Sequence, residues 1–348
     1  MQKTRLVLLF SVFVSLHLPA NQSQISMSQT EQAQTGQTSA GESHKEWYSH
    51  SFEVMGTQAK VEFEANNKSL ADQLIGQVVE EMNRIDRGMS PYKPESELNL
   101  INQKASRAPL VISEEMFKLL QRSLYFSRLT KGAFDISFSS VGYLYDYRRK
   151  IRPQAAQIEK LTPAIDYRKI KLDSNSLSVF FSDPRVKIDL GGIAKGYAVD
   201  RCIQLLQKAG INNAYVNAGG DSRLIGKKQD RLWYIGIRHP RDENKLLANL
   251  PLEEIALSTS GDYERFFIED GVRYHHIIDP KTGQSVDSIQ SATILASDST
   301  SADALSTSLF VMGVEQGMSL VNSLEGVSAI IVDHHGKLFV SEDLASAN

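Results

Sequence analysis

The chain has 348 residues, 41% of them hydrophobic and 23% charged, which is the composition of an ordinary globular protein. Its formal net charge of -3, with no strong basic or acidic block, argues against nucleic acid as a partner. The length is compatible with two domains or with one large domain.

Residues 1–20 have the features of a secretory signal peptide. Lys3 and Arg5 form a positively charged start, residues 6–18 are mostly apolar, and Ala20 offers a small residue for cleavage. The apolar run is shorter than the roughly 18–20 residues that a membrane-spanning helix needs, although an uncleaved membrane anchor stays open as the alternative. We therefore expect an exported, periplasmic protein whose signal peptide is cleaved.

Residues 21–46 are rich in Gln, Ser and Thr and nearly lack large apolar side chains. Such a segment cannot bury enough surface to offset the entropy of ordering it, so we predict a disordered spacer. The folded domain is predicted to span residues 47–343. Its one cysteine, Cys202, falls inside a predicted helix and lies too far along the chain to carry a lipid anchor. Because a single cysteine cannot form an internal disulfide, the core must stabilise the fold.

The first elements of the domain follow from periodicity. Residues 59–64 alternate between apolar and charged side chains, which predicts a strand. A helix follows up to Gly88, and Ser69 with Asp72 resembles a capping box at its start. Tyr92 lies between two prolines, and it could stack on a planar ligand or simply cover the surface. Ser113 is predicted to cap the next helix, which ends at Gly132.

The segment from Val186 to Asp200 has the clearest local signal for a ligand. We predict a short strand over residues 186–190, a turn at Gly191 and Gly192, and a helix from about Ile193 to Gly210. Free N–H groups at the start of a helix can bind an anion, and Lys195 there opposes the helix dipole. A phosphate-bearing ligand is one interpretation, and a tight turn with a solvated lysine is the other.

The second half of the chain is predicted to alternate strands and turns. Short strands are expected over 213–217, 233–237 and 292–296, and residues 256–261 are predicted to be a strand that runs into a polar loop. A helix should begin near Asp298 and end at Gly313, a second should lie around residues 318–321, and a hairpin turn should fall at 333–336. The predicted fold class is α+β, with mixed, mostly antiparallel sheets flanked by helices in one unit of two lobes.

Two groups of residues in this half could carry chemistry. Asp303 and Thr307 are four residues apart on a predicted helix, so both side chains project from one face as oxygen ligands for Mg²⁺. A capping aspartate and a threonine that bonds backward along the helix would show the same spacing. His275 and His276 alternate on a strand, so only one of them can face a site, where it could act as a general base.

Taken together, eight segments in a fixed order resemble the ApbE family of FAD:protein FMN transferases over roughly residues 48–340. The segments are Met55-Gly56-Thr57, Ser90-Pro91-Tyr92, Gly132-Ala133-Phe134-Asp135, residues 189–196, residues 217–221, Ser258-Thr259-Ser260-Gly261, residues 275–283 and residues 301–307.

The resemblance implies an enzyme that binds FAD with Mg²⁺ in a cleft between two lobes, transfers the FMN moiety to a Thr or Ser of a target flavoprotein and releases AMP. It implies targets such as subunits of sodium-pumping quinone reductase or of Rnf-type complexes, which can be membrane-bound. His276 matches the family's base, and Asp303 is the second catalytic residue. The FAD contacts that it implies are Met55, Tyr92, Ala133, Phe134, Asp135, Asp189, Lys195 and Ile278. The metal ligands that it implies are Gly192 through its carbonyl, Asp303, Ser306 and Thr307.

Two departures from the family pattern bear on location and target. The lipid-anchoring cysteine that is frequent in the family is missing, so we expect a soluble protein after export. Residues 136–150 differ from the Pro-Trp version that is common in relatives, which affects target choice more than chemistry. Two other functions remain open: a periplasmic FAD pyrophosphatase that makes FMN and AMP, and a flavin-binding or electron-transfer protein without catalysis.

Overall fold

A computed structural model describes residues 45–346. The predicted signal peptide and nearly all of the predicted spacer lie outside this range. The first strand begins at Glu46, close to the predicted start of the folded domain. None of the helices in the described range is long and apolar enough to cross a membrane.

The framework is one eight-stranded sheet in which every neighbouring pair is antiparallel. In spatial order its strands are β1 (Glu46–Val54), β2 (Thr57–Ala65), β6 (Ala214–Ala218), β7 (Asp221–Ile225), β10 (Ile255–Gly261), β13 (Ile289–Ala296), β14 (Ser328–Asp333) and β15 (Leu338–Val340).

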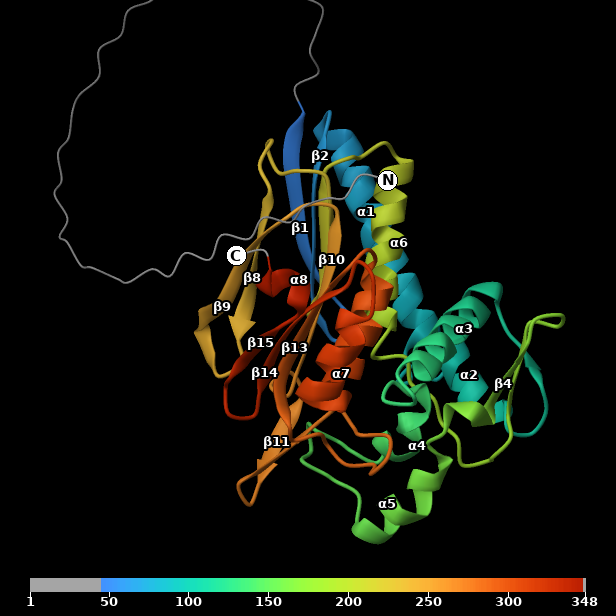
Figure 1. Cartoon of the computed structure of the whole chain (residues 1–348). Helices are drawn as coiled ribbons and strands as arrows, with labels where there is room; N and C mark the ends of the chain where they lie inside the picture. The colour runs from blue at the N-terminus through green and yellow to red at the C-terminus, as the bar shows by residue number, and fades with distance from the viewer. Residues whose placement is uncertain (1–44, 347–348) are drawn as a thin grey trace, which may run out of the picture.

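Three long helices cover one face of this sheet: α1 (Lys68–Met89), α6 (Ala194–Lys208) and α7 (Ser299–Asn322). The hairpin of β8 (Trp233–His239) and β9 (Asp242–Leu252) covers the other face, with the short α8 (Glu342–Ala345). Figure 1 shows both layers. Alternation along the strands supplies both cores, because neighbouring residues such as Ile294 and Leu295 point to opposite faces and pack in different clusters.

The segment between α1 and α6 forms a second lobe beside these helices (Figure 1). It contains α2 (Glu97–Lys104), α3 (Glu114–Leu129), α4 (Ser139–Gly142), α5 (Ala155–Leu161), three 3₁₀ turns (Ile136–Phe138, Thr162–Ala164 and Tyr167–Lys169) and a small antiparallel sheet of β3 (Leu110–Val111), β5 (Ser178–Phe181) and β4 (Ile170–Asp173). A separate hairpin of β11 (Phe266–Glu269) and β12 (Val272–His275) follows β10 in the chain. The predicted α+β class is confirmed.

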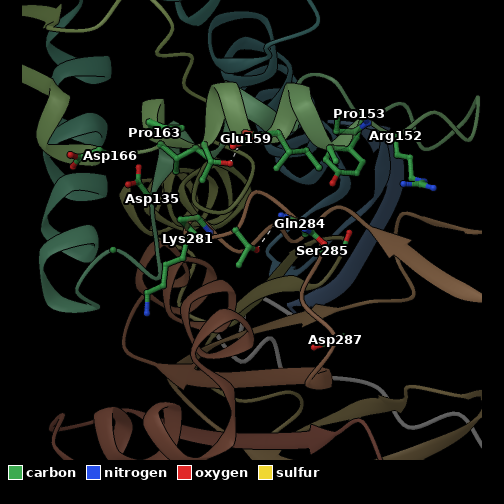
Figure 2. Close-up of a pocket in the computed structure, with 18 of the residues that line it drawn as sticks. Asp135, Arg152, Pro153, Glu159, Pro163, Asp166, Lys281, Gln284, Ser285 and Asp287 are labelled. Atoms are coloured by element: carbon green, nitrogen blue, oxygen red, sulfur yellow. Dashed lines mark hydrogen bonds between the residues drawn. The ribbon is translucent and has the colours of Figure 1, made fainter.

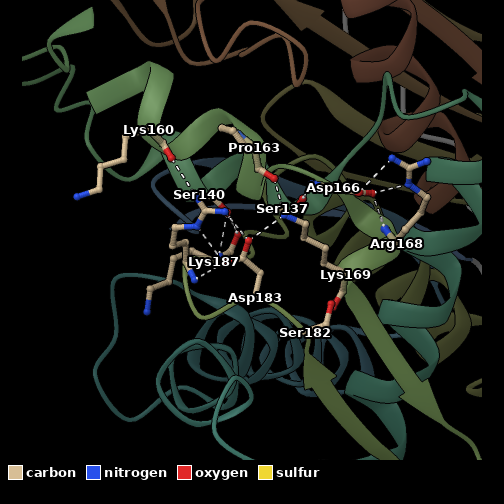
Figure 3. Close-up of polar contacts among 11 residues, drawn as sticks. Ser137, Ser140, Lys160, Pro163, Asp166, Arg168, Lys169, Ser182, Asp183 and Lys187 are labelled. Atoms are coloured by element: carbon tan, nitrogen blue, oxygen red, sulfur yellow. Dashed lines mark hydrogen bonds and ion pairs between the residues drawn. The ribbon is translucent and has the colours of Figure 1, made fainter. Parts of the chain in front are cut away.

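The predicted strand over residues 186–190 is wrong, because no strand pairs with this segment. Its backbone groups are satisfied by other partners. The Ile188 N–H donates to the Asn102 side chain at 2.8 Å, and the Lys187 N–H donates to Ser140 Oγ at 3.0 Å. Figure 3 shows Lys187 beside Ser140, with Asp183 paired to Lys169 where the segment begins. The segment is therefore extended and apolar but makes no strand-to-strand hydrogen bonds. Periodicity alone cannot distinguish such a segment from a strand.

Two smaller predictions also need correction. The first helix is capped by Asn67, whose side chain accepts the Leu70 N–H, and not by Ser69. Residues 258–261 continue β10 instead of leaving it as a loop. Other boundaries are confirmed: Ser113 caps α3, and Gly313 breaks the long α7 with a φ of 80° and a ψ of 177°.

The contact between α6 and α7 depends on Gly196. A Cβ atom there would lie 2.1 Å from the Ser299 carbonyl oxygen and 2.8 Å from the Asp303 Cβ atom. Both are far inside van der Waals contact, and the first is a backbone atom that cannot rotate away. Any side chain at position 196 would therefore push the two helices apart.

We predict that Gly196→Ala lowers the free energy of unfolding by about 1–3 kcal/mol or more, the range for overpacking a well-packed core. Gly76→Ala is the matched control, because a Cβ atom on this exposed residue of α1 would meet nothing within 4 Å. In α1 the Gly76→Ala change should raise the free energy of unfolding by about 0.5–1 kcal/mol, because alanine has a higher helix propensity than glycine. Urea unfolding of both variants measures the difference, and an unchanged midpoint for Gly196→Ala would contradict the packing argument.

Candidate active site

The centre of the candidate site is a lysine between two buried carboxylates. Lys195, in the first turn of α6, places its Nζ atom 2.6 Å from Asp221 on β7 and 3.7 Å from Asp303 on α7. The carboxylate side chains are almost fully buried, with 2% and 3% exposure. Burial opposes the charge on Lys195, but the two carboxylates raise its pKa, so the ammonium stays protonated.

A chain of hydroxyl groups continues from this cluster. Ser258 Oγ donates to Asp221 Oδ1 at 2.6 Å and lies 3.0 Å from Ser306 Oγ. Ser306 Oγ in turn lies 2.8 Å from Ser260 Oγ, which is 3.4 Å from Thr307 Oγ1. The structure therefore brings Asp303, Ser306 and Thr307 together, and it adds two serines of β10 that line the same place.

The start of α7 is held in place by a buried aspartate of α6. Asp200 accepts the Ser299 N–H at 2.9 Å and the Thr300 N–H at 2.8 Å, and it pairs with Arg223 at 2.7 Å. A carboxylate at a helix N-terminus satisfies free N–H groups and matches the helix dipole. Asp303 lies one turn further on, and its Oδ2 atom accepts the Gly196 N–H at 3.0 Å.

The donor set around Asp303 fits a hard divalent cation. Burial raises the pKa of Asp303, and the neighbouring charge of Asp221 raises it further, because two carboxylates share one ammonium. A second positive charge would relieve this repulsion. Gly192 lies against Thr307, since a Cβ atom on the glycine would be 3.1 Å from Thr307 Oγ1.

Among residues 45–346 no group of three or more His, Cys, Asp or Glu side chains could form a metal cage. The oxygen set of one carboxylate, hydroxyl groups and a backbone carbonyl instead suits an ion such as Mg²⁺, which commonly takes its other ligands from water and substrate phosphates.

The two adjacent histidines have different environments. His275 is buried and satisfied, because Nε2 lies 2.5 Å from the Val286 carbonyl oxygen and Nδ1 accepts the Ile277 N–H at 3.3 Å. His276 is only half-buried, yet its Nδ1 atom is enclosed without any hydrogen-bond partner among the described residues. Buried polar atoms are nearly always paired, so this ring nitrogen is free to form a hydrogen bond with a bound molecule. His276 is thus the histidine that faces the site.

Charge around His276 keeps its imidazole neutral. Burial is the largest cause, followed by the positive charge of Arg265, and together with His275 and Lys195 they lower the pKa of His276 to about 3. A neutral imidazole is the form that can accept a proton.

The predicted FAD contacts lie in three neighbouring places. Met55 occupies the β1–β2 turn with a φ of 53°, a left-handed conformation that is uncommon for a residue with a side chain. Tyr92 is 82% exposed, and the charges of Asp189 and Arg265 lie close enough to act on its hydroxyl. Asp189 accepts the Gly191 N–H at 2.6 Å and so fixes the glycine turn.

Residues 133–135 approach the site from the second lobe. The Phe134 ring reaches Gly192, where a Cβ atom would lie 3.3 Å from its Cε2 atom. Asp135 is buried and already accepts the Ser137 N–H at 2.9 Å and the Tyr167 N–H at 2.8 Å. Its carboxylate is therefore committed to holding the loop. The N–H groups of Ala133 and Phe134 are also engaged, because they donate to the Thr130 carbonyl at 3.1 Å and to Thr130 Oγ1 at 2.9 Å. Ile278 is buried and pairs with Ser285 in an isolated bridge.

A cavity of about 1330 Å³ adjoins this side of the site. Figure 2 shows Glu159 and Pro163, from α5 and the turn that follows it, facing Lys281 and Gln284 across it. Gly132 and Asp135 line it, but Lys195, His276 and Asp303 do not. The cavity is therefore next to the polar cluster and not the place where that cluster would act.

Comparison with known proteins identifies the family. The model of the ApbE family matches residues 55–331. The chain belongs to the ApbE family. It is 34% identical over 266 residues to the FAD:protein FMN transferase of Vibrio cholerae, covering 74% of this chain and 78% of that one. It is 30% identical over 298 residues to the FAD:protein FMN transferase of Klebsiella pneumoniae, covering 84% and 92%.

Solved structures of ApbE proteins have the same fold. The ApbE protein of Thermotoga maritima superposes with a TM-score of 0.80 at 34% identity, covering 86% of this chain and 99% of that one. The flavin transferase ApbE of Vibrio cholerae gives a TM-score of 0.78 at 28% identity, covering 87% and 99%. The sequence-based assignment to the ApbE family is thus confirmed.

Several residues of the site were not singled out from the sequence. Asp221 lies in the segment 217–221 that carries the resemblance to the ApbE family, and Asp200 and Arg265 carry no local signal. Only the fold brings Asp221 next to Asp303, 82 positions later in the chain. A buried acid directly after a glycine pair was the one hint available for Asp221.

We predict that the His276 ring stays neutral from pH 8 down to pH 5 in the ligand-free protein, because its pKa of about 3 lies well below the ordinary value. Imidazole ¹⁵N shifts in a pH titration measure this, with the His276→Gln variant identifying the signal. A midpoint between pH 6 and 7 for that ring would contradict the predicted environment.

Proposed function

We propose that the chain is a Mg²⁺-dependent transferase that moves the FMN moiety of FAD to a Thr or Ser hydroxyl of a target flavoprotein and releases AMP. The observation that carries this proposal is the unpaired Nδ1 of His276 in a site that also holds the Lys195–Asp221–Asp303 cluster. We propose FAD as the substrate because the similar proteins in the ApbE family are named FAD:protein FMN transferases.

FAD would lie in the cleft between the lobes. Tyr92, exposed on its proline-flanked turn, has a free ring face on which an isoalloxazine can stack. Met55 and Asp189 border the same space, and the loop of Ala133 and Phe134 closes it from the second lobe. The N–H groups at the start of α6 would meet the phosphates, as helix N-termini do for other anions.

Mg²⁺ would be held by Asp303 and Thr307, with Ser306 beside them and the Gly192 carbonyl as a further donor. A bound Mg²⁺ would neutralise charge on the pyrophosphate and polarise its phosphorus–oxygen bonds. The glycine at position 192 matters because its backbone lies directly against Thr307. Lys195 would reduce the repulsion between the carboxylates of Asp221 and Asp303, since its ammonium group lies between them.

His276 would accept the proton of the acceptor hydroxyl. The hydroxyl oxygen forms a bond to the phosphorus on the FMN side, and the bond from that phosphorus to the bridging oxygen breaks. AMP leaves with the electron pair of that bond. A base and a positioned hydroxyl are sufficient for such an in-line displacement, because most of the catalysis comes from positioning and charge stabilisation.

Water can replace the acceptor in the same site, because it offers the same base an O–H group in place of the Thr or Ser hydroxyl. FAD hydrolysis to FMN and AMP is therefore the second candidate function. We also propose export to the periplasm, which rests on the features of residues 1–20 and which makes a periplasmic domain of a membrane-bound flavoprotein a suitable target.

We predict that the purified chain, given FAD, Mg²⁺ and a flavoprotein target, adds the mass of FMN to a Thr or Ser of the target. Intact-protein mass spectrometry measures the adduct, and chromatography measures AMP. AMP release at the same rate with and without target would favour the hydrolase. Stable FAD binding without either product would contradict both enzymes and support a flavin-binding protein.

We further predict that Asp303→Asn abolishes transfer without lowering the free energy of unfolding. The amide oxygen can still accept the Gly196 N–H, and the repulsion from Asp221 is gone. Glu315→Gln, at an exposed position on the same helix, is the control and should transfer normally. If Asp303→Asn unfolds the protein instead, the aspartate is structural and the metal assignment is wrong.

A further inference from the structure

We propose that Arg265 binds the pyrophosphate of FAD directly and is a catalytic residue beyond those implied by the family resemblance. This inference rests on the proposed function, because it concerns the same substrate in the same site. Four observations on Arg265 support it: its place in the β11–β12 hairpin, the reach of its side chain, the absence of a partner, and its effect on neighbouring charges.

The hairpin puts Arg265 directly opposite His276. Phe266 pairs with His275 at the end of the β11–β12 ladder, and the His276 N–H donates to the Arg265 carbonyl at 3.1 Å. Side chains opposite each other in an antiparallel pair project to the same face. Arg265 and His276 therefore share the face of the hairpin that continues with the stacked rings of Phe267 and Tyr274.

The guanidinium extends from this hairpin to the β1–β2 turn. Its Nη2 atom lies 3.7 Å from where a Cβ atom on Gly56 would be, next to Met55. The side chain thus bridges the space between the proposed base and the turn that supplies a predicted FAD contact. A ligand that touches both Met55 and His276 has to pass this guanidinium.

Arg265 has no carboxylate within 4.0 Å in the described part of the chain, unlike the arginines around it. Arg238 pairs with Glu264 at 2.6 Å, Arg241 with Asp262 at 2.6 Å, and Arg273 with Asp262 at 3.8 Å. Arg265 is also exposed. An arginine left unpaired among paired ones, at the edge of a site, can offer its planar fork of donors to a phosphate.

The charge of Arg265 reaches the rest of the site. The charge of Arg265 is the largest cause, after burial, of the lowered pKa of His276. The same charge lowers the pKa of Asp189, against the effect of burial, which raises it. Arg265 thus adds a positive charge to the hairpin side of the site, whereas the charge of Lys195 is shared by Asp221 and Asp303. An anionic ligand compensates that charge, whereas a neutral flavin ring does not, which points to the pyrophosphate as the group that Arg265 recognises.

A comparison of FAD and riboflavin binding separates direct recognition of the pyrophosphate by Arg265 from a structural role of this residue. Flavin fluorescence titrations in metal-free buffer with EDTA would compare FAD with riboflavin, which has the same ring and no phosphate. A lost charge-assisted hydrogen bond corresponds to a loss of about 10- to 100-fold in FAD affinity for Arg265→Gln, with riboflavin affinity unchanged. Arg265→Lys should recover part of the loss, because a point charge replaces the fork. FMN transfer should fall in parallel.

Arg238→Gln is the matched control, because it removes the same charge from a neighbouring arginine that already has a carboxylate partner. It should bind FAD and transfer FMN like the unchanged chain. The inference is overturned if Arg265→Gln binds FAD as Arg238→Gln does, or if it loses riboflavin and FAD equally. If the unchanged chain transfers no FMN, the proposed function fails instead, so the two failures are distinguishable.

Discussion

The close contact between α6 and α7 at Gly196 is the constraint on which the site depends. Because position 196 has no side chain, the backbone of α7 approaches α6 closely enough for the Gly196 N–H to donate to Asp303. The same approach lets Asp200, one turn along α6, accept the first N–H groups of α7. Two helices from distant parts of the chain are thereby fixed in one register, and Lys195 and Asp303 become neighbours as a consequence of that register.

The site that results has two regions of opposite charge. On the α6–α7 side, two buried carboxylates share one lysine, so this region gains from an added cation. On the hairpin side, Arg265 and the neutral His276 leave an excess of positive charge that gains from an added anion. A pyrophosphate bound together with a divalent cation satisfies both regions at once, whereas either one alone leaves a repulsion in place. The charge pattern therefore favours the joint binding of metal and dinucleotide over the binding of a bare flavin.

Much of the fold could be predicted from the sequence, because strands with one buried face and capped helices carry their own periodicity. The helix cap at Ser113 and the helix break at Gly313 could be predicted for that reason. Residues 186–190 were not, since an apolar extended run looks the same whether a strand or the side chains of Asn102 and Ser140 satisfy its backbone. The local pattern could not choose between His275 and His276, and only the resemblance to the ApbE family selected His276. In the structure the Val286 carbonyl engages the ring of His275. Asp221 and Arg265 needed the fold, since their partners are remote in the chain.

The position of His276 also links the chemistry to residues 145–152 of the second lobe. Its hairpin stands outside the main sheet and is held by aromatic packing, with Tyr147 against Phe267 and Tyr145 stacked on Tyr147. Arg152 adds an ion pair to Glu269 and lies over the Tyr274 ring. These contacts come from residues 145–152, of which Tyr145 and Arg152 also line the neighbouring cavity. Because Tyr147 and Arg152 themselves contact the hairpin, a change at either residue would alter the support of the hairpin, and with it the position of His276, as well as the neighbouring surface.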